Sequence, residues 1–514
     1  MNFSRDVIDR RDPGDLALLE LARDGSRREW RFGEVSERAA RLAGSLERRG
    51  VCRGDVVMTL IGNRPEWVLA MLACFRIGAI VLPCTEQSRA KDLRLRIDHA
   101  RPALILADER NRDELEAAGV SGAETLPASD VQSAERRPGG DVPIAYVPDE
   151  SLFAAPPAAA AVDLADGDPC LITFTSGTAG EPKAVVHGQR YLDGQRLQAE
   201  HWLGARPGEL VWCTAASGWS KSARNVFIAP WLSGAAALLH DARFDPDQRL
   251  ELLERERVNV LCMAPTEYRV IAKRTTLRPL ADLRGLVAAG EALNPEVLRA
   301  WREATGLEIR DGYGQTETGQ LTGMPLGVPA RPGSMGMALP GVGLSVEDRE
   351  LTVDPATVPT FFLGYLDEHV RRAVDGAWIV EDRRDGGPWL TGDRVTEDED
   401  GWLRFEGRSD DVIVSAGYRI GPFEVESALV AHPAVAEAAA VAAADEERGA
   451  VVRAVVVLRD GAYSPSPELV RELQEHVKRE TAPYKYPRII DFVAELPKTA
   501  NGKVRRAELR RAGS

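Results

Sequence analysis

The chain contains 514 residues, a length that allows three or four units at roughly 100 to 200 residues per domain and excludes a single small binding module. Its 65 lysines and arginines against 79 aspartates and glutamates give a formal net charge of -14, which disfavours non-specific binding to nucleic acid. Hydrophobic residues make up 44% of the chain and charged residues 28%, which is typical of a soluble globular protein and not of a disordered one.

The cysteines and the N-terminal residues predict a cytoplasmic location. The six cysteines are scattered without a C-x-x-C pair, so we expect buried reduced thiols and neither a disulfide framework nor a thiolate zinc site. Residues 1–15 alternate acids with bases and lack the apolar core of a secretory signal. The most apolar stretch, residues 68–83, is interrupted by Arg76 and Gly78 and is too short for a membrane span.

Strand-length apolar segments alternate with helix-length segments early in the chain, which predicts a parallel α/β sheet. Residues 121–168 are rich in Pro, Gly, Asp and Ala and are expected to form a surface connection. A second α/β stretch is expected from Cys170 to about Gly312. Strands are predicted at residues 55–61, 79–84 and 103–108, and helices at 65–78 and 91–100.

The pattern changes in the last third of the chain. After Arg331, short alternating runs with many glycines and prolines predict a mostly β region. From Asp411 onward we expect a compact α+β unit with helices at residues 422–432 and 467–481. The Ala-rich run at 435–445 suits a helix or a strand. The predicted fold is therefore α/β, with doubly wound α/β subdomains and a β-rich subdomain in a large N-terminal domain, followed by a small C-terminal α+β domain.

One polar segment stands out, TFTSGTAGEPKAVVH at residues 173–187. Glycines let the main chain approach a phosphate, hydroxyl and amide groups donate to its oxygens, and a lysine adds positive charge. The order is not that of the Walker loop, and such a cluster taken alone favours a polar surface turn. The candidate phosphate contacts are Thr175, Ser176, Gly177, Thr178, Gly180 and Lys183.

Six segments, in this order, resemble motifs of the adenylate-forming superfamily of acyl-CoA synthetases, peptide-synthetase adenylation domains and luciferases. They are TSGTAGEPK (175–183), GEAL (290–293), DGYGQTETG (311–319), TGD (391–393), GRSDDVIVSAGYRIGPFEVE (407–426) and LPKTANGKVRR (496–506). Other segments are similar to medium-chain acyl-CoA synthetases, namely SGWSKSA (217–223), MAPTEYR (263–269), GYRIGPFEVESAL (417–429) and TAPYKYPR (481–488). The resemblance covers nearly the whole chain.

The resemblance implies an AMP-forming acyl-CoA synthetase that uses ATP, Mg²⁺ and CoA. A medium-chain, aromatic or branched carboxylic acid would become an acyl-adenylate, and the acyl group would then pass to CoA. A carrier protein or an amine is the alternative acceptor, and a nucleotide-binding regulatory protein without catalysis is a rival of another class. The implied domains are 1–407 for ATP and the acid, a hinge at 408–410, and a mobile domain at 411–514. The sequence leaves a monomer and a homodimer open.

The resemblance also assigns roles to residues around ATP. Tyr313 would contact adenine, Thr316 a phosphate, and Glu317 the Mg²⁺ bridging the phosphates, for which one carboxylate is sufficient. The resemblance also implies that Asp393 accepts from both ribose hydroxyls, for which the two oxygens of a carboxylate are suited, and that Arg408 is its partner. The other expected contacts are Arg419 at the α-phosphate and Gly290, Glu291, Asp311 and Gly312 near the nucleotide. Without the other motifs, these segments would be interpreted as turns.

The resemblance implies further roles for residues of the C-terminal part. Asp410 would be the hinge. Lys503 would swing into the site and stabilise developing charge, with Thr178 and Glu317 as the other catalytic candidates. Arg448 is expected either to contact a phosphate of CoA or to be a solvated charge on a loop. Ser415, Ala416 and Gly417 are expected to border a pantetheine tunnel, and Arg505, Arg506, Arg510 and Arg511 to form a solvated helix face.

The acyl pocket is expected at Trp219, Lys221, Ser222 and Gly314. Trp219 suits a pocket wall or a core position, and Lys221 suits a polar substrate group or solvent. Gly314 stands where members restricted to acetate carry a tryptophan, which implies room for a longer or aromatic acid. His187 would line the pocket or be a hydrogen-bonded core histidine, and we favour the second.

The chain departs from the family motifs in three places. Ala179 replaces a threonine, which removes a hydroxyl worth about 0.5–1.5 kcal/mol. Ala292 replaces a common proline. The hairpin before residues 362–365 is expected to be short.

Overall fold

The computed structural model describes most of the chain, and several predicted site residues lie outside the described part. The residues described are 1–120, 142–158, 160–175, 182–290, 293, 295–373, 376–409, 411–415, 418–445, 448–459, 463–481, 483–498 and 504–511, without the side chains of Val414 and Arg419. The predictions for Ser176, Gly177, Thr178, Ala179, Gly180, Glu291, Ala292, Asp410, Ala416, Gly417 and Lys503, and for the side chain of Arg419, lie outside this part.

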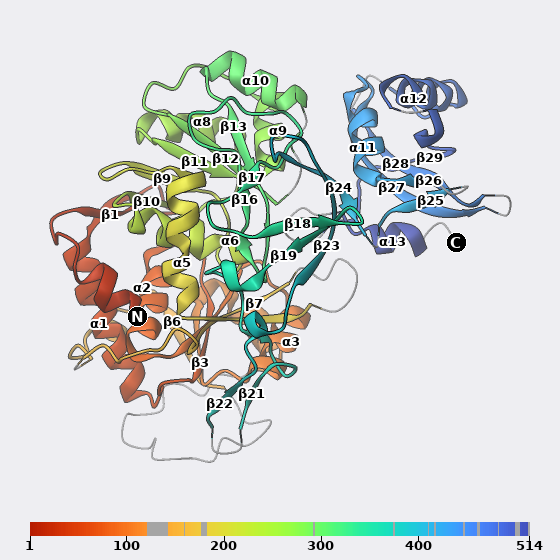
Figure 1. The fold of residues 1–514 in the computed structure, drawn as a ribbon. Helices are drawn as coiled ribbons and strands as arrows, with labels where there is room; N and C mark the ends of the chain where they lie inside the picture. Colours follow the sequence, from red (N-terminus) through yellow and green to blue (C-terminus); the bar gives the residue numbers. More distant parts are fainter. Residues whose placement is uncertain are drawn as a thin grey trace.

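Two seven-stranded sheets form the framework of the N-terminal part (Figure 1). In the first sheet, with the order β13-β12-β11-β9-β10-β1-β2, all pairs are parallel except β1 with β2. Its strands are β1 (Leu16–Leu21), β2 (Arg27–Arg31), β9 (Leu210–Cys213), β10 (Ala236–His240), β11 (Val260–Met263), β12 (Gly285–Ala289) and β13 (Ile309–Gly312).

The second sheet has the order β20-β8-β7-β4-β3-β5-β6. Its strands from β7 to β6 are parallel, whereas β8 pairs antiparallel with both β7 and β20. Its strands are β3 (Val56–Leu60), β4 (Ile80–Cys84), β5 (Leu104–Asp108), β6 (Ile144–Val147), β7 (Pro169–Phe174), β8 (Ala184–Gly188) and β20 (Gly364–Tyr365).

The strands of both sheets bury alternate residues on opposite faces, because successive side chains of a strand point in opposite directions. In β9, Val211 packs in one hydrophobic cluster and Trp212 in another. In β3, Val57 and Met58 divide in the same way. One cluster contains residues of both sheets together with the helices between them, so the N-terminal part is a stack of five layers, helix, sheet, helix, sheet, helix.

The helices begin and end where local sequence signals place them. Pro65 opens α2 at its first position, and Gly78 ends it with a left-handed φ of 73°. The helices packed between the sheets are α1 (Phe32–Arg48), α2 (Pro65–Ile77), α5 (Arg190–Gln198), α7 (Ala229–Leu232) and the π-helices η4 (Ala199–Leu203) and η5 (Arg224–Ile228). The outer helices are α3 (Ala90–Ala100) and α4 (Arg112–Ala117) on the second sheet, and α8 (Pro246–Arg255), α9 (Pro265–Arg274) and α10 (Pro295–Thr305) on the first.

A β-rich region follows, as predicted. Its main sheet is antiparallel, with the order β18-β19-β23-β24. Asp348 and Arg349 form a two-residue turn between β18 and β19, both with positive φ, so the hairpin is short as expected. The strands are β14 (Gly314–Gln315), β15 (Gly319–Gln320), β16 (Thr322–Gly323), β17 (Met337–Ala338), β18 (Leu344–Glu347), β19 (Glu350–Val353), β21 (Val370–Arg372), β22 (Trp378–Val380), β23 (Trp389–Glu397) and β24 (Leu403–Arg408).

The C-terminal unit lies beside the larger part, next to β24, and has its own hydrophobic core (Figure 1). Its three-stranded sheet has the order β27-β28-β29, and the Ala-rich run forms the strand β27. The elements are β25 (Ile413–Ser415), β26 (Tyr418–Ile420), α11 (Pro422–Ala431), β27 (Val435–Asp445), β28 (Gly449–Leu458), α12 (Pro467–Glu480), β29 (Ile489–Phe492) and α13 (Arg506–Arg511). The predicted α/β fold with a small α+β domain is confirmed.

Short helical turns complete the chain. They are the π-helix η1 (Ser4–Ile8), the short helix α6 (Ser220–Ala223), and the 3-10 turns η2 (Glu109–Asn111), η3 (Glu150–Phe153), η6 (Pro355–Thr357), η7 (Arg383–Asp385) and η8 (Pro483–Lys485). None of the helices in the described ranges is long and apolar enough to cross a membrane.

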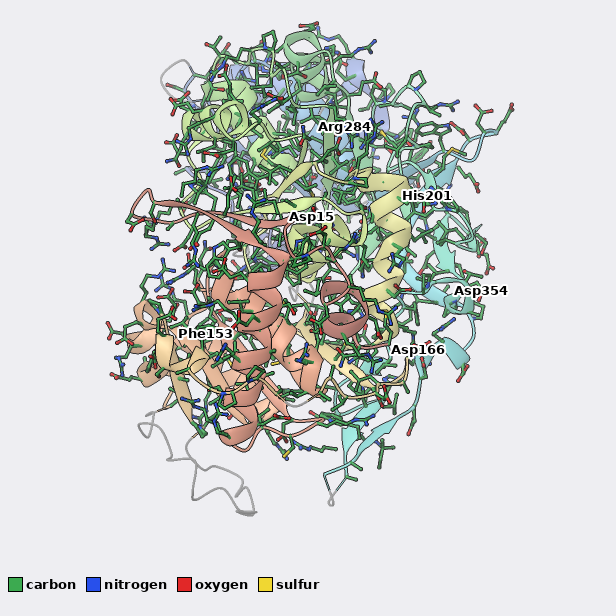
Figure 2. All side chains as sticks on the ribbon, turned by 90° about the vertical axis from the view of Figure 1, so that its left-hand side faces the viewer. Asp15, Phe153, Asp166, His201, Arg284 and Asp354 are labelled. Atoms are coloured by element: carbon green, nitrogen blue, oxygen red, sulfur yellow. The ribbon has the colours of Figure 1, made fainter. Side chains whose placement is uncertain are left out.

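Three expectations were wrong in part. The connection before Asp168 is not only surface: it supplies β6, and Phe153 (labelled in Figure 2) packs in the core. The guanidinium of Arg38 lies 4.1 Å from the centroid of the Phe153 ring. Cys52 is exposed, whereas the other five thiols are buried. The last helix is a solvated face only in part, because Arg505 and Arg511 are exposed, whereas Arg506 pairs with Glu426 and Arg510 with Asp411.

The two sheets meet where their parallel strands end. Gly218, on the segment after β9, has a φ of +89°, and a Cβ added there would overlap the main chain at Cys84 and Thr85 after β4. This approach brings the carboxyl ends of strands from both sheets to one edge of the molecule. Ligands of α/β proteins bind at such an edge.

Gly218→Ala should destabilise the protein strongly. The left-handed conformation costs an alanine about 1–2 kcal/mol, and overlap with the main chain adds about 1–3 kcal/mol. Gly208→Ala is the matched control, since Gly208 has a φ of +79° with no atom within 4 Å of an added Cβ. Thermal unfolding of the two variants should show a clearly larger loss for Gly218→Ala, and equal losses would show that the close approach is not rigid.

Candidate active site

The predicted phosphate loop begins and ends at the neck of the β7–β8 hairpin. The amide of Thr175 donates to the carbonyl of Lys183 over 2.9 Å, and the amide of Lys183 donates to Thr175 Oγ1 over 3.0 Å. The two ends of the predicted loop are thereby held together. The ammonium of Lys183 lies 4.5 Å from the centroid of the Tyr365 ring and 3.7 Å from Glu368 Oε1.

Tyr365 connects this lysine to the candidate magnesium carboxylate. Its hydroxyl donates to Glu317 Oε1 over 2.8 Å, and burial together with that carboxylate raises the pKa of Tyr365. The amide of Phe362 fixes the main chain of Glu317, donating to its carbonyl over 2.8 Å. Within the described chain, no hydrogen bond reaches the second oxygen of Glu317. Tyr365 was not predicted from the sequence, although its place at the end of the FLGY segment, in the strand β20 that pairs with β8, was a signal.

The candidate ribose carboxylate, Asp393, lies at the centre of a hydrogen-bond cluster. It is only 5% exposed, and its Oδ2 accepts from the hydroxyl of Tyr313 and, over 2.8 Å, from Gln315 Nε2. Arg408 Nη1 donates to Oδ1 over 3.3 Å. Burial raises the pKa of Asp393. The structure thus brings together three residues predicted for adenine and ribose, and adds Gln315, which the sequence analysis did not identify.

Trp389 holds Gln315 in place. Its indole nitrogen donates to Gln315 Oε1 over 3.1 Å, so the amide nitrogen of Gln315 is left to face Asp393. Trp389 also packs edge-on against Phe361 and Phe362. Because these rings are buried, the polar cluster rests on a rigid base.

Asp311 and Lys221 lie near the ends of β13 and β12. The carboxyl of Asp311 accepts from the amide of Gly312 over 2.8 Å, and burial raises the pKa of Asp311 to about 8. Lys221 donates to the carbonyl of Ala289 over 3.0 Å, at the end of β12. An added Cβ on Gly290, whose φ is +106°, would lie 3.0 Å from that ammonium. Lys221 therefore does not simply face solvent.

The predicted acyl wall is present around α6. Trp219 is half-buried, which separates it from the core tryptophans, and Ser222 is buried with its hydroxyl donating to the carbonyl of Trp219 over 2.6 Å. Gly314 has a structural reason to be glycine, since an added Cβ would overlap the carbonyl of Gly319 in the β14–β15 pair. The expectation that Gly314 leaves room for a longer or aromatic acid stays a prediction.

His187 is a core residue, but it is not hydrogen-bonded as we expected. It is fully buried, its ring packs against that of Tyr191 with centroids 4.0 Å apart, and neither ring nitrogen has a hydrogen-bond partner among the described residues. Burial, helped by the charges of Arg224 and Arg190, lowers the pKa of His187 to about 3, so the ring is neutral.

Two further candidates belong to the C-terminal unit. Ser415 is buried at the end of β25, and Arg448 is exposed, its amide donating to Asp445 Oδ1 over 2.9 Å. No contact between described residues joins either of them to the Asp393 cluster. Their predicted roles toward CoA stay predictions.

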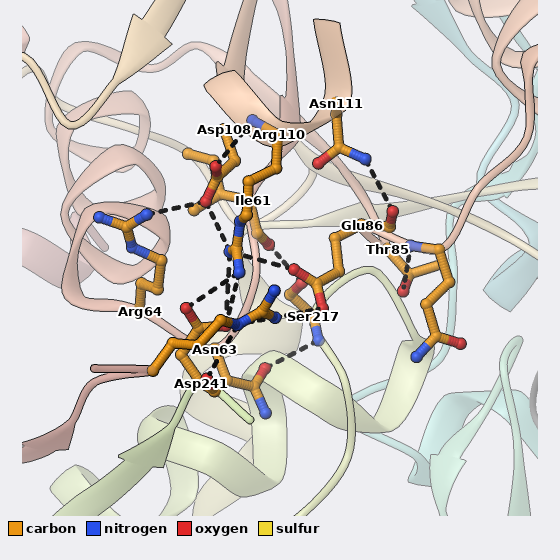
Figure 3. A network of polar contacts seen from close by, with 12 residues as sticks. Ile61, Asn63, Arg64, Thr85, Glu86, Asp108, Arg110, Asn111, Ser217 and Asp241 are labelled. Atoms are coloured by element: carbon orange, nitrogen blue, oxygen red, sulfur yellow. Dashed lines mark hydrogen bonds and ion pairs between the residues drawn. The ribbon is translucent and has the colours of Figure 1, made fainter. Parts of the chain in front are cut away.

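A charged cleft of about 750 Å³ opens beside the acyl wall, between the two sheets. Arg110 joins its carboxylates, with its guanidinium 2.6 Å from Asp108, 3.1 Å from Glu86 and 3.2 Å from Asp241 (Figure 3). Asn63 holds the wall, accepting from the amide of Ser217 over 2.9 Å. The cations that line the cleft are Arg23, Arg89, Arg110, Arg243 and Arg249, against the acids Glu86, Asp241 and Glu267. This cleft was not predicted from the sequence because its residues come from seven separate segments.

Two sequence profiles match the chain. The AMP-binding enzyme family matches residues 6–365, and the AMP-binding enzyme C-terminal domain matches residues 424–503. The chain belongs to the AMP-binding enzyme family. The predicted resemblance to adenylate-forming enzymes is confirmed.

Relatives of this AMP-binding enzyme match over nearly their full length. The uncharacterized acyl-CoA ligase YtcI of Bacillus subtilis is 39% identical over 96% of this chain and 92% of its own. The mitochondrial acyl-coenzyme A synthetase ACSM3 of Rattus norvegicus is 37% identical over 99% of this chain and 90% of its own. A crystal structure of the anthranilate CoA ligase AuaEII in complex with anthranoyl-AMP superposes with a TM-score of 0.83, at 27% identity over 99% of this chain and 97% of that one.

Asp311→Asn should stabilise the ligand-free enzyme increasingly as the pH rises. The unfolded chain releases the proton of Asp311 near its ordinary pKa of 3.8, whereas the folded state holds it up to about pH 8. Between these values the folded state binds more protons than the unfolded state, so the free energy of unfolding falls by about 1.4 kcal/mol per pH unit. Asparagine does not titrate. Melting temperatures from pH 5 to 9 should therefore diverge up to about pH 8 and then run parallel, and a difference that is constant over this range would contradict the assignment.

Proposed function

We propose that this enzyme is an AMP-forming acid–CoA ligase. In the first step an oxygen of the substrate carboxylate attacks the α-phosphorus of ATP, and pyrophosphate leaves. In the second step the thiolate of CoA attacks the acyl carbonyl, and AMP leaves. The observation that supports the proposal is the Asp393 cluster, in which a buried carboxylate, a tyrosine and an arginine come together, along with the contacts that Tyr365 makes to Lys183 and Glu317.

The cluster suits a nucleotide because of its donors and acceptors. A carboxylate offers about four acceptor positions, and three hydrogen bonds reach Asp393, so one remains for a ribose hydroxyl in this arrangement. The hydroxyl of Tyr313 is engaged by Asp393, which leaves the ring face for the adenine base. Lys183 at the loop neck adds the positive charge that the phosphates need.

The residues present also suit magnesium. Mg²⁺ takes one or two carboxylates and completes its shell with phosphate oxygens and water. Glu317 offers one oxygen while Tyr365 occupies the other. When bound, the ion would neutralise charge on the phosphates of ATP.

We propose the domain roles that the motifs imply. Residues 1–407 bind ATP and the acid, 408–410 form the hinge around Asp410, and 411–514 rotate between the two half-reactions. Lys503 serves the adenylation step, with Thr178 and Glu317, and the region of Ser415 and Gly417 serves the thioester step. Arg419 is proposed at the α-phosphate, and Thr175, Ser176, Gly177, Gly180, Gly290, Glu291, Gly312 and Thr316 around the nucleotide.

The relatives support CoA as the acceptor. YtcI is named an acyl-CoA ligase and ACSM3 an acyl-coenzyme A synthetase, at 39% and 37% identity over almost the whole chain. The expectation of an acid–CoA ligase is thereby confirmed, and a carrier protein or an amine becomes the second candidate acceptor. The identity of the acid, a cytoplasmic location and a homodimer stay predictions.

The charged cleft suits the phosphate-rich end of CoA. Its inner wall, residues 214–217, leads directly to Trp219 and Lys221 in the acyl wall. Arg243 is exposed at its mouth, and no described carboxylate lies within ion-pair distance of it, unlike Arg23, Arg110 and Arg249. We propose that Arg243 meets a CoA phosphate.

Arg243→Ala should raise KM for CoA about two- to fivefold, the effect of losing an exposed ion pair of roughly 0.5–1 kcal/mol. The ATP–pyrophosphate exchange rate, which reports adenylation alone, should not change. Arg302→Ala, which removes an exposed arginine from α10, is the matched control. An unchanged KM for CoA would exclude this cleft as the CoA site.

Lys503→Ala tests the two-step mechanism. Adenylation should fall by at least 100-fold, because Lys503 is the group proposed to stabilise the charge that develops on the carboxylate and α-phosphate oxygens. Thioester formation from supplied acyl-adenylate should be spared. The matched control is Lys498→Ala, which removes a lysine of the same segment that pairs with Glu437 over 2.5 Å. Mass spectrometry of AMP and acyl-CoA follows both steps, and equal loss in both would contradict the role of Lys503.

A further inference from the structure

A buried polar cluster lies between β8, α5 and η5, outside the Asp393 cluster. Each of its side chains is at most 5% exposed. Two contacts show that they pack together: Gln198 Nε2 donates to Asn225 Oδ1 over 3.0 Å, and His187 packs against Tyr191. The members of this cluster, here called the η5 polar cluster, are His187, Tyr191, Gln195, Gln198, Arg224 and Asn225.

Arg224 is a buried cation without a counter-charge. It is 5% exposed, and no described carboxylate lies within 4.0 Å of its guanidinium. Two of its nitrogens, Nε and Nη1, are buried and donate to no acceptor among the described residues. The hydroxyl of Tyr191 lies within reach of the guanidinium, but a neutral hydroxyl does not balance its charge. His187 is neutral as well.

A buried cation without a counter-charge lowers the stability of the ligand-free protein. Buried charges in proteins are almost always paired, because removal from water is not repaid by neutral neighbours. Arg190, in the adjacent helix, follows this rule, since its guanidinium donates to both oxygens of Asp382 over 2.6 and 2.8 Å. Arg224 departs from it, so a ligand that brings the missing charge is the simplest physical reason for its presence.

Arg224 lies close in sequence to the proposed acyl wall. It follows α6, whose residues include Lys221 and which begins just after Trp219. The charges of Lys221 and Arg224 both act on the thiol of Cys262, at the carboxyl end of β11. On its other side lies His187, whose ring faces the main chain of Thr316, the predicted phosphate contact. Arg224 is thus placed between the proposed acyl wall and the proposed phosphate site.

The remaining unpartnered atoms of the η5 polar cluster are also polar. They include Gln195 Oε1, Gln198 Oε1, Asn225 Nδ2 and both ring nitrogens of His187. A plain hydrocarbon chain satisfies none of them and leaves the cation buried. A carboxylate accepts two parallel hydrogen bonds from a guanidinium and neutralises its charge.

We propose that Arg224 binds a second carboxylate on the acyl part of the substrate, so the enzyme activates a dicarboxylic acid. The inference rests on the proposed function, because it names the substrate class of that site. One carboxylate reacts with ATP, and the other stays ionised against Arg224. The product is then a CoA thioester with a free carboxylate at its far end.

Matched pairs of acids test this proposal. Succinate, glutarate and adipate are compared with butyrate, pentanoate and hexanoate, each at equal chain length, by mass spectrometry of AMP and acyl-CoA. The best diacid should exceed its matched monoacid at least tenfold in kcat/KM. In Arg224→Met, activity with that diacid should fall at least 100-fold, while activity with the matched monoacid rises. A wild-type enzyme that prefers the monoacid, or equal loss for both acids in Arg224→Met, would overturn the proposal.

A binding measurement separates this proposal from the proposed function. The preferred diacid alone should raise the melting temperature of the wild type, its matched monoacid should not, and Arg224→Met should lose the response. Ligand-free Arg224→Met should melt at or above the wild-type temperature, since an unpaired cation is removed. Arg190→Met, which leaves Asp382 unpaired, should melt lower and keep the response to the diacid.

If no acid yields AMP, the proposed function fails, and the melting response still decides the role of Arg224. The role of Arg224 would be refuted if the diacid still raises the melting temperature of Arg224→Met, or if no diacid raises that of the wild type. Either result would count even if the ligase reaction is found.

Discussion

The close contact between the main chain at Gly218 and the end of β4 determines where the site lies. The two sheets belong to different stretches of sequence, and each is stabilised by its own outer cluster and by the helices between them. Because no side chain separates Gly218 from Cys84 and Thr85, the carboxyl ends of the parallel strands converge on one edge. The acyl wall, the charged cleft and the end of β12 near Lys221 all lie at this edge.

Much of the fold was predictable because it depends on local signals. Pro65 and Gly78 mark α2, and alternating apolar residues mark the strands. The Ala-rich run was undecided, since alanine has no periodic contrast, and its pairing with β28 along its whole length made it a strand. Phe153 and the strand β6 were missed because a segment rich in Pro and Gly still contributes an edge strand when β5 offers an open edge. Arg506 and Arg510 were misjudged for a similar reason, since their acidic partners are distant in sequence.

The candidate site was predictable in part. Family motifs located Tyr313, Asp393 and Arg408, and the structure brings them together through hydrogen bonds. Motifs did not reveal Gln315, Tyr365 or the cleft, whose contacts span up to 218 residues of sequence. A single sequence shows residue types but not which polar atoms lack a partner after folding. The unbalanced charge of Arg224 therefore had no sequence signal beyond its place near Trp219.

Three buried ionisable groups point to one arrangement of charge. Burial raises the pKa of both Asp311 and Asp393, and leaves Arg224 without an anion. Each group lowers the stability of the ligand-free protein, as residues at functional sites often do. Asp393 reduces this cost with three hydrogen bonds from neighbours, whereas Arg224 has no comparable partners. An unbalanced cation on the acyl side of the site attracts an anion to that side. The same charges that weaken the fold would then orient an acid with two carboxylates, so that only one of them meets ATP.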